Sequence, residues 1–335
     1  MPRRRTILLG GGAAAIAAPA AVARAQAPVA GGRTVRLVVP FPPGGAVDIL
    51  GRLLAERLGP ALGQTVVVEN RAGAGGLVGT EVVARGDRDG SILGLVGVTT
   101  FCAMPFMHGR MPFDPVRDLM PVSQVTDGAL LCVVNAETAR RNGWNGFRDL
   151  ILWSRAHPEE VRMGSSGNAT SSHLNIEAVN RFAEARILHV PYRGGAPAIN
   201  DLLAGNIEMM FDVMPALVPH VEAGRFRALA VSSGDPLTIL PEIPGMKAFA
   251  DLGLGEHSVV TWNALATAGG TPAPVVQRLF EAVRAVAAQP EFVERLKPLG
   301  YGTVPSESPA ALARLIEAET PRWKRLVEIS GARVD

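Results

Sequence analysis

The residues most able to bind a ligand lie at positions 40–48, which read Pro-Phe-Pro-Pro-Gly-Gly-Ala-Val-Asp. A short apolar run, Val35–Val39, precedes this stretch, and a helical pattern follows it. Gly44 and Gly45 would let a ligand approach the backbone closely and would leave amide N–H groups unblocked at the helix start. Such groups, together with the positive end of the helix dipole, attract an anion. The stretch therefore predicts an anion-binding loop.

A second stretch of the same kind follows, in which a strand pattern at 65–70, Thr-Val-Val-Val-Glu-Asn, leads to Gly73-Ala74-Gly75-Gly76 and to a helical pattern from Leu77. Both loops come after strands, and ligands of α/β sheets lie at the carboxyl ends of the strands. We therefore expect two helix N-termini to face one anionic ligand. Glycine loops before helices also serve tight packing alone, so the pair predicts a site without naming its ligand.

The elements that must position these loops alternate between strands and helices along most of the chain. This alternation predicts an α/β fold in which mainly parallel sheets are flanked by helices. The helix after the first loop carries an apolar stripe from Leu50 to Leu58. We expect Asp48 to cap this helix and Gly59-Pro60 to end it.

An apolar strand at residues 129–134 is expected to begin a second lobe. Two more strand–loop–helix junctions follow, around residues 164–173 and 191–197, and a strand at 227–231 would lead the chain back. The expected division is residues 26–128 plus 232–335 for the first lobe and residues 129–231 for the second. Two lobes joined by two crossings form a cleft that can close on a small ligand.

The first 25 residues have the pattern of an export signal. Arg3–Arg5 form a charged start, a weakly hydrophobic core runs from Leu8 to Val22, and Ala23-Arg24-Ala25 is a small-residue cleavage site. The core is too short for a membrane anchor. We expect an exported, periplasmic protein cleaved near Ala25, through the twin-arginine route that Arg4-Arg5 favours or through general secretion.

The charge balance changes when this segment is removed. The full chain has 33 basic and 31 acidic residues, and four of the arginines lie in residues 1–25, so a formal charge of +2 becomes −2. With no basic block and 5% aromatic residues, the mature chain lacks the features of a protein that binds nucleic acid. Cys102 and Cys132 are the only cysteines, and their spacing leaves open a disulfide or two buried thiols.

Catalytic and metal-binding motifs offer the main alternative to a binding protein. Residues 164–167, Gly-Ser-Ser-Gly, lack the Gly-x-Ser-x-Gly pattern of a nucleophile elbow. The spacing of Gly73, Gly75 and Gly79 differs from that of a dinucleotide-binding loop. The histidines show no spacing typical of metal ligands. They are His108, His157, His173, His189, His220 and His257. We therefore expect no catalysis, no metal and no cofactor.

Taken in order, several segments resemble the periplasmic substrate-binding receptors of tripartite tricarboxylate transporters, the Bug family. The segments that carry the resemblance span nearly the whole mature chain. They are Pro40–Gly45 with Asp48, Gly63-Gln64, Val68–Asn70, Gly73–Gly76, Asp89-Gly90, Gly164–Gly167 with His173-Leu174, Val190–Gly194, Leu229–Ser232, and Trp262 with Gly270–Pro272. Their joint order is more specific than any one of them.

The resemblance implies a two-lobed Venus-flytrap fold of the type II periplasmic-binding-protein class. Receptors of this family capture a small carboxylate and deliver it to a membrane permease of one large and one small subunit. We expect this chain to do so as a monomer, and signalling to a sensor protein is the alternative output. Citrate, other di- or tricarboxylates, acidic amino acids and aromatic carboxylates all fit as ligands.

The resemblance also implies the contacts, with the ligand carboxylate held by backbone amides and water instead of an arginine side chain. The implied ligand-binding residues of the first lobe are Phe41, Gly44, Gly45, Val47, Asp48, Ala74, Gly75 and Gly76. Those of the second lobe are Ser165, Gly167, Thr170 and Tyr192. Asp212 is a secondary candidate, and an acid facing the cleft would prefer a ligand that also carries an amine or a hydroxyl.

Overall fold

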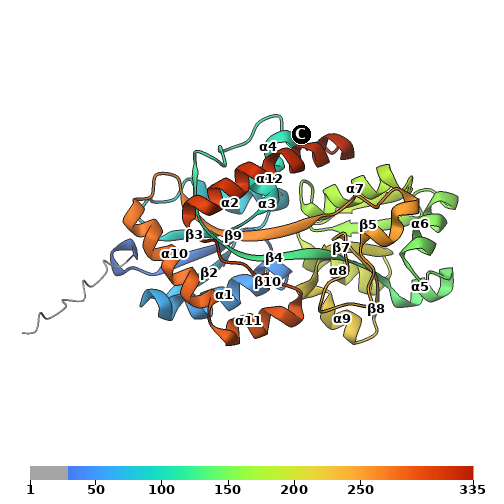
Figure 1. Ribbon diagram of the computed structural model, residues 1–335, viewed down its shortest axis with the longest axis horizontal. Helices are drawn as coiled ribbons and strands as arrows, with labels where there is room; N and C mark the ends of the chain where they lie inside the picture. Colours follow the sequence, from blue (N-terminus) through green and yellow to red (C-terminus); the bar gives the residue numbers. More distant parts are fainter. Residues whose placement is uncertain (1–28, 335) are drawn as a thin grey trace, which may run out of the picture.

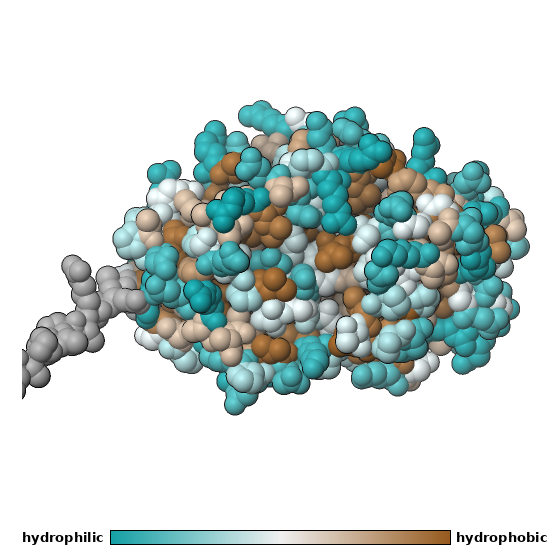
Figure 2. Space-filling model, in the orientation of Figure 1, coloured by the Kyte–Doolittle hydropathy of each residue, from teal (hydrophilic) through white to brown (hydrophobic). Residues whose placement is uncertain are grey.

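The computed structural model describes residues 29–334, which form two lobes side by side (Figure 1). The expected leader and its cleavage site at Ala25 lie outside the described residues. Within residues 29–334, no helix combines the length and the apolar character that crossing a membrane requires. On the face shown in Figure 2, hydrophobic side chains lie in small separate groups among hydrophilic ones.

The first lobe is a mixed sheet with helices on both faces. Its strands are β1 (Val35–Val39), β2 (Val66–Asn70), β3 (Ile92–Gly97), β9 (Val260–Ala268), β10 (Gly302–Thr303) and the first part of β4 (Leu119–Asn135). Its helices are α1 (Ala46–Leu62), α2 (Leu77–Ala84), α3 (Val98–Cys102), α4 (Met104–Met107), α10 (Ala273–Ala287), α11 (Pro290–Leu296) and α12 (Pro309–Ser330), with short 3-10 turns η1 (Val29–Gly32), η2 (Ala74–Gly76) and η5 (Lys297–Leu299). Strands β2, β1 and β3 are parallel, and β9 runs antiparallel between β3 and β4.

The second lobe repeats this plan. Its strands are β5 (Val161–Ser165), β6 (Ile187–Pro191), β7 (Met209–Val213), β8 (Phe226–Val231) and the second part of β4. Its helices are α5 (Ala136–Asn142), α6 (Phe147–Ala156), α7 (Ser171–Phe182), α8 (Gly195–Ala204) and α9 (Val218–Glu222), with 3-10 turns η3 (Met214–Ala216) and η4 (Met246–Leu252). Strands β6, β5 and β7 are parallel, while β4 runs antiparallel to β7 and β8. Each lobe thus has a parallel part, as predicted, and an antiparallel part around β4.

Successive residues of β1 point to opposite faces of the first sheet, and both faces are covered. Leu37 shares one core cluster with Leu54 of α1 and Leu279 of α10. Val38, the next residue, shares another cluster with Val83 of α2 on the opposite face. Burying one such side chain contributes about 1.5–3 kcal/mol to the free energy of folding. This arrangement confirms the predicted α/β layers.

Strand β4 crosses from one lobe to the other. Its residues Leu119–Ala129 pair with β9, whereas its residues Leu130–Asn135 pair with β7 and β8. Figure 1 shows β4 and β9 as the long strands that run between the two lobes. We therefore propose the first lobe boundary at residues 129–130.

The segment after β8 bears on where the chain returns to the first lobe, which the sequence predicts at residue 232. Beyond β8, the ring of Phe249 packs against Phe147 of α6 with centroids 5.0 Å apart. Asp251 forms an ion pair with Arg148, which also belongs to α6, at 2.5 Å. Because this segment packs on the second lobe, we propose a boundary just before β9, near residue 259, in place of residue 232.

Helix α1 differs from the prediction at both ends. It continues through Pro60 to Leu62, and Gly63, with φ +67°, forms its C-cap. Proline removes only its own N–H from the last turn, so the stop comes at the left-handed glycine. At the other end the N-cap is Gly45, and no side chain caps the helix, so the expectation for Asp48 was wrong.

Cys102 and Cys132 are free and buried, so they do not form a disulfide. Burial raises the pKa of the Cys102 thiol to about 11 and also raises that of Cys132. Because the thiolate is the reactive form, we expect neither thiol to react with a maleimide in the folded protein and both to react in denaturant. Mass spectrometry after timed labelling checks this, and rapid modification of the folded protein would contradict it.

Candidate functional site

The four strand–loop–helix junctions expected from the sequence meet in two pairs between the lobes. Gly194, before α8, faces Pro42, before α1, so closely that a Cβ on Gly194 would overlap the proline ring. Gly75 and Asn168 meet in the same way, since a Cβ on Gly75 would overlap the Asn168 carbonyl oxygen. The lobes are therefore closed on each other at both pairs.

A cavity of ≈ 40 Å³ lies between the lobes at the first pair. It is enclosed by the start of α1, the start of α8 and the end of β7 with the turn that follows. Its lining residues are Phe41, Gly45, Ala46, Val47, Ser166, Gly195, Ile199, Asp212, Val213, Ala216 and Leu217. Pockets for drug-sized ligands occupy roughly 300–1,000 Å³, so a ligand must enter while the lobes stand further apart.

Both helix starts at this cavity lack a side-chain cap. In α1 the first intrahelical bond joins the Ile49 N–H to the Gly45 carbonyl at 3.0 Å, so the preceding N–H groups have no acceptor within the helix. In α8 the N-cap is Gly194, with φ +120° and again no side-chain cap. The positive ends of two helix dipoles thus border the cavity. Among its described lining residues none is basic.

Asp48 supports the first loop from within the lobe and does not line the cavity. Its Oδ2 accepts hydrogen bonds from the Gly44 N–H and from Arg52 Nε, both at 2.9 Å, and its Oδ1 accepts one from Asn70 Nδ2 at 2.8 Å. Asn70 also donates to the Phe41 carbonyl at 3.0 Å, which ties the end of β2 to the first loop. Burial alone would raise the pKa of Asp48, but the hydrogen bonds from Arg52, Gly44 and Asn70 outweigh it and lower that pKa.

Hydrogen bonds within residues 165–170 hold the second pair of junctions. The Thr170 hydroxyl donates to the Gly167 carbonyl at 2.7 Å, and the same residue caps α7. Ser165 Oγ lies 2.6 Å from His189 Nε2 and accepts a hydrogen bond from the Gly167 N–H at 3.2 Å. These side chains fix the loop that meets the first lobe.

The structure places the expected site residues in two groups. Phe41, Gly45 and Val47 line the cavity, as does the secondary candidate Asp212. The others lie in the four junctions or at their edges, outside the cavity lining. They are Gly44, Asp48, Ala74, Gly75, Gly76, Ser165, Gly167, Thr170 and Tyr192. Contact of either group with a ligand stays a prediction.

Several lining residues were not singled out by the sequence. They are Ala46, Ser166, Gly195, Ile199, Val213, Ala216 and Leu217. Ser166 and Gly195 lie inside two of the glycine-containing junctions, so the loop pattern could have included them. The turn after β7 has no motif, and only the folded chain brings it to the cavity.

The chain matches the family model described as "Tripartite tricarboxylate transporter family receptor" over residues 50–332. It belongs to this receptor family. The receptor is 38% identical to the "UPF0065 protein in tcbD-tcbE intergenic region" of Pseudomonas sp. (strain P51), over 88% of this chain and 85% of that protein. The expected family membership is therefore confirmed.

Solved structures agree with this membership. The periplasmic binding protein BugD matches the receptor with a TM-score of 0.83 and 31% identity, over 90% of this chain and 98% of that one. Rpa4515 of R. palustris, solved with adipate, has the same TM-score and 30% identity, over 90% of this chain and 99% of that one. These likenesses confirm the predicted periplasmic-binding-protein fold.

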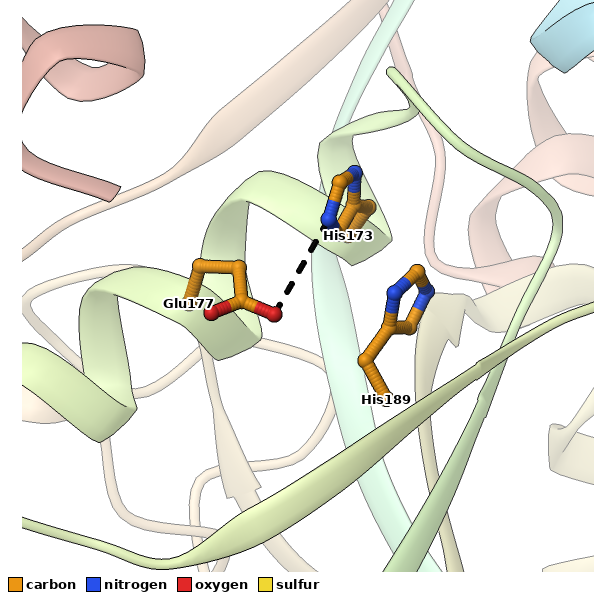
Figure 3. Close-up of side chains that lie close together, drawn as sticks. All are labelled: His173, Glu177 and His189. Atoms are coloured by element: carbon orange, nitrogen blue, oxygen red, sulfur yellow. Dashed lines mark ion pairs between the residues drawn. The ribbon is translucent and has the colours of Figure 1, made fainter. Parts of the chain in front are cut away.

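A second polar cluster consists of His173, Glu177 and His189 (Figure 3), and its histidines contact Ser165 and Ala169 of the loop at residues 165–170. The side-chain atoms of His173, Glu177 and His189 that could coordinate a metal ion lie within 4.8 Å of one another. The histidine spacing did not predict this grouping, because His189 comes from β6. The Ala169 N–H donates to His173 Nδ1 at 3.2 Å. The neutral ring therefore carries its proton on Nε2, the nitrogen that faces Glu177.

This protonation state opposes metal binding, because a metal needs the lone pair that the Nε2 proton occupies. The rings of His173 and His189 also stack, with centroids 4.2 Å apart. Burial lowers the pKa of His173 to about 4, and burial together with His173 lowers that of His189 to about 3. We interpret the pair as neutral side chains that support the loop above them.

Proposed function

We propose that this receptor binds a small organic carboxylate between its lobes in the periplasm and delivers it to a membrane permease of one large and one small subunit. The observation that carries the proposal is the cavity between two uncapped helix starts, whose described lining residues include no basic side chain. Backbone N–H groups at a helix N-terminus readily bind a carboxylate. The adipate in the Rpa4515 structure supports this class of ligand. The proposal includes cleavage of the leader near Ala25 and action as a monomer.

In this proposal the ligand carboxylate lies on the first turn of α1. Gly45, Ala46 and Val47 border the cavity there, and Phe41 forms one wall. Each charge-assisted hydrogen bond from an N–H group to a carboxylate contributes about 1.5–3 kcal/mol. Asp48 contributes indirectly, by fixing the loop before the helix.

The proposal excludes catalysis. Ser165 and His189 have the separation of a nucleophile and its base, at 2.6 Å. However, Ser165 is fully buried, and its hydroxyl is engaged with Gly167. A substrate carbonyl cannot reach it, so this pair serves the loop. A carboxylate recovered unchanged after incubation with the receptor would agree with this assignment, and a product would contradict it.

A thermal-shift screen of carboxylates on residues 26–335 tests the proposed function. A ligand that binds only the folded state at 100 times its Kd adds about 2.7 kcal/mol to the free energy of unfolding. We expect at least one organic carboxylate to raise the unfolding temperature and amines without a carboxylate to leave it unchanged. A broad carboxylate panel without any shift would overturn the proposal.

Replacing Gly45 with valine tests the position of the carboxylate. Gly45 has φ −79°, which valine adopts freely, and a Cβ there would meet only the Pro42 carbonyl oxygen, at 3.6 Å. The fold should therefore accept Gly45→Val, while the added methyl groups obstruct the amides of α1. We expect at least a tenfold loss of affinity for the best carboxylate of the screen, measured by calorimetry.

Gly109→Val is the matched control, because Gly109 is exposed and a Cβ there meets nothing within 4 Å. This variant should bind like the unmodified receptor. Equal affinity of Gly45→Val and Gly109→Val would place the carboxylate elsewhere.

A further inference from the structure

Asp212 stands apart from the other residues around the cavity. Among the described lining residues it is the only one with an ionisable side chain. It is buried at the end of β7, and its Oδ2 lies 2.9 Å from the position that a Cβ on Gly195 would take. The carboxylate therefore borders the start of α8, across the cavity from the first turn of α1.

Within residues 29–334, no cationic side chain forms an ion pair with Asp212 or shifts its pKa. Its Oδ1 accepts a hydrogen bond from the Val213 N–H at 2.8 Å. The residue paired with Asp212 on β4 is the apolar Leu131. The negative charge of Asp212 acts on the Tyr301 phenol, because burial and Asp212 together raise the pKa of Tyr301. Burial raises the pKa of Asp212 to about 6, against the lowering effect of Val213 and of the Ser166 hydroxyl. At neutral pH the cavity thus holds one negative charge.

The negative charge of Asp212 acts on the ligand group that lies beside the start of α8. A hydroxyl or ammonium group there can donate a charge-assisted hydrogen bond to the carboxylate. A second ligand carboxylate would share the closed site with a like charge, and two carboxylates in one site raise the pKa of one of them strongly. Binding of a second ligand carboxylate beside Asp212 therefore requires that one of the two carboxylates takes up a proton.

We propose that Asp212 selects the ligand by the chemical group at the end of the ligand opposite the carboxylate that α1 binds. A ligand hydroxyl or ammonium binds the ionised Asp212, whereas a second carboxylate binds there only together with a proton taken up from solution. This inference rests on the proposed function, and it narrows the ligand class to carboxylates that carry a hydrogen-bond donor at their other end when the pH is neutral or higher.

Two matched series of compounds test the inference. The first is adipate, 6-hydroxyhexanoate and 6-aminohexanoate, and the second is succinate, 4-hydroxybutyrate and 4-aminobutyrate. Within each series only the group at one end changes. Titration calorimetry in buffers of different ionisation heat gives both the affinity and the number of protons taken up on binding.

We expect the affinity of the dicarboxylates to fall about tenfold for each pH unit above the Asp212 pKa, which is about 30-fold between pH 7 and pH 8.5, with uptake of about one proton. The hydroxy and amino compounds should bind with nearly constant affinity and without proton uptake over this range. In Asp212→Asn the pH dependence for dicarboxylates should disappear, and the hydroxy and amino compounds should lose about tenfold in affinity. Asp235→Asn removes an exposed carboxyl paired with Lys247. This control should change neither the pH dependence for dicarboxylates nor the affinity for the hydroxy and amino compounds.

The outcomes separate the two proposals. Dicarboxylate binding without proton uptake and without pH dependence in the unmodified receptor would overturn the role of Asp212 and leave the carboxylate receptor intact. This measurement needs no variant, so it decides even where Asp212→Asn fails to fold. Absence of binding by every carboxylate of both series and of the thermal-shift panel would overturn the proposed function, and this inference with it.

Discussion

Gly75→Ala is expected to abolish ligand binding while leaving the receptor folded. In the closed form a Cβ at Gly75 would overlap the carbonyl oxygen of Asn168, a backbone atom of the opposite lobe that cannot rotate away. The residue also has φ +64°, which costs about 1–2 kcal/mol for an L-residue with a side chain. We expect at least a 100-fold loss of affinity, which corresponds to about 2.8 kcal/mol, because closure is blocked. Calorimetry measures this loss, and small-angle X-ray scattering should show no contraction on addition of ligand.

Gly63→Ala separates closure from backbone strain. Gly63 has a similar φ of +67°, but a Cβ there meets nothing within 4 Å and the residue lies at the C-cap of α1. This variant should lose a similar amount of stability and keep the affinity of the unmodified receptor. If both variants bind equally well, contact between Gly75 and Asn168 does not accompany ligand capture.

The sequence predicts the parts of the fold that depend on local patterns. Glycines next to strand ends mark the four junctions, and the alternation of strands with amphipathic helices indicates the α/β layers. The end of α1 shows the limit of such reasoning. Gly59-Pro60 has the composition of a helix stop, yet the left-handed Gly63 ends the helix, and φ values are not visible in a sequence.

The site depends on contacts between segments far apart in the chain, which local patterns do not contain. Nothing near Gly75 indicates that it meets Asn168, and nothing near Pro42 indicates Gly194. The cavity likewise joins the first turn of α1 to residues 212–217. The resemblance to a known family supplied candidates on both lobes, but only the folded chain separates those that line the cavity from those that hold the loops.

Asp48 illustrates this separation and leads to the second large effect, a loss of stability in Asp48→Asn. The carboxylate accepts three hydrogen bonds, from Gly44, Arg52 and Asn70, and is buried. An asparagine amide would direct an NH₂ group at some of these donors and leave them unpaired. Loss of buried hydrogen bonds to a charged group costs about 3 kcal/mol here, and we expect urea unfolding at pH 7 to show a decrease of that size.

The pH dependence of this effect has a definite sign. The pKa of Asp48 is lowered in the folded state from its ordinary value of 3.8, so the carboxylate adds stability above that value and loses this contribution as the pH falls through the lowered one. The difference in unfolding free energy between the receptor and Asp48→Asn should therefore be constant from pH 7 to about pH 5 and shrink below about pH 4.

Asp149→Asn is the control, since Asp149 accepts backbone hydrogen bonds at the start of α6, away from the cavity. It should lose stability without losing affinity, whereas Asp48→Asn should lose both because the loop before α1 is no longer fixed. Retention of full affinity in Asp48→Asn would show that the first loop keeps its shape without the carboxylate.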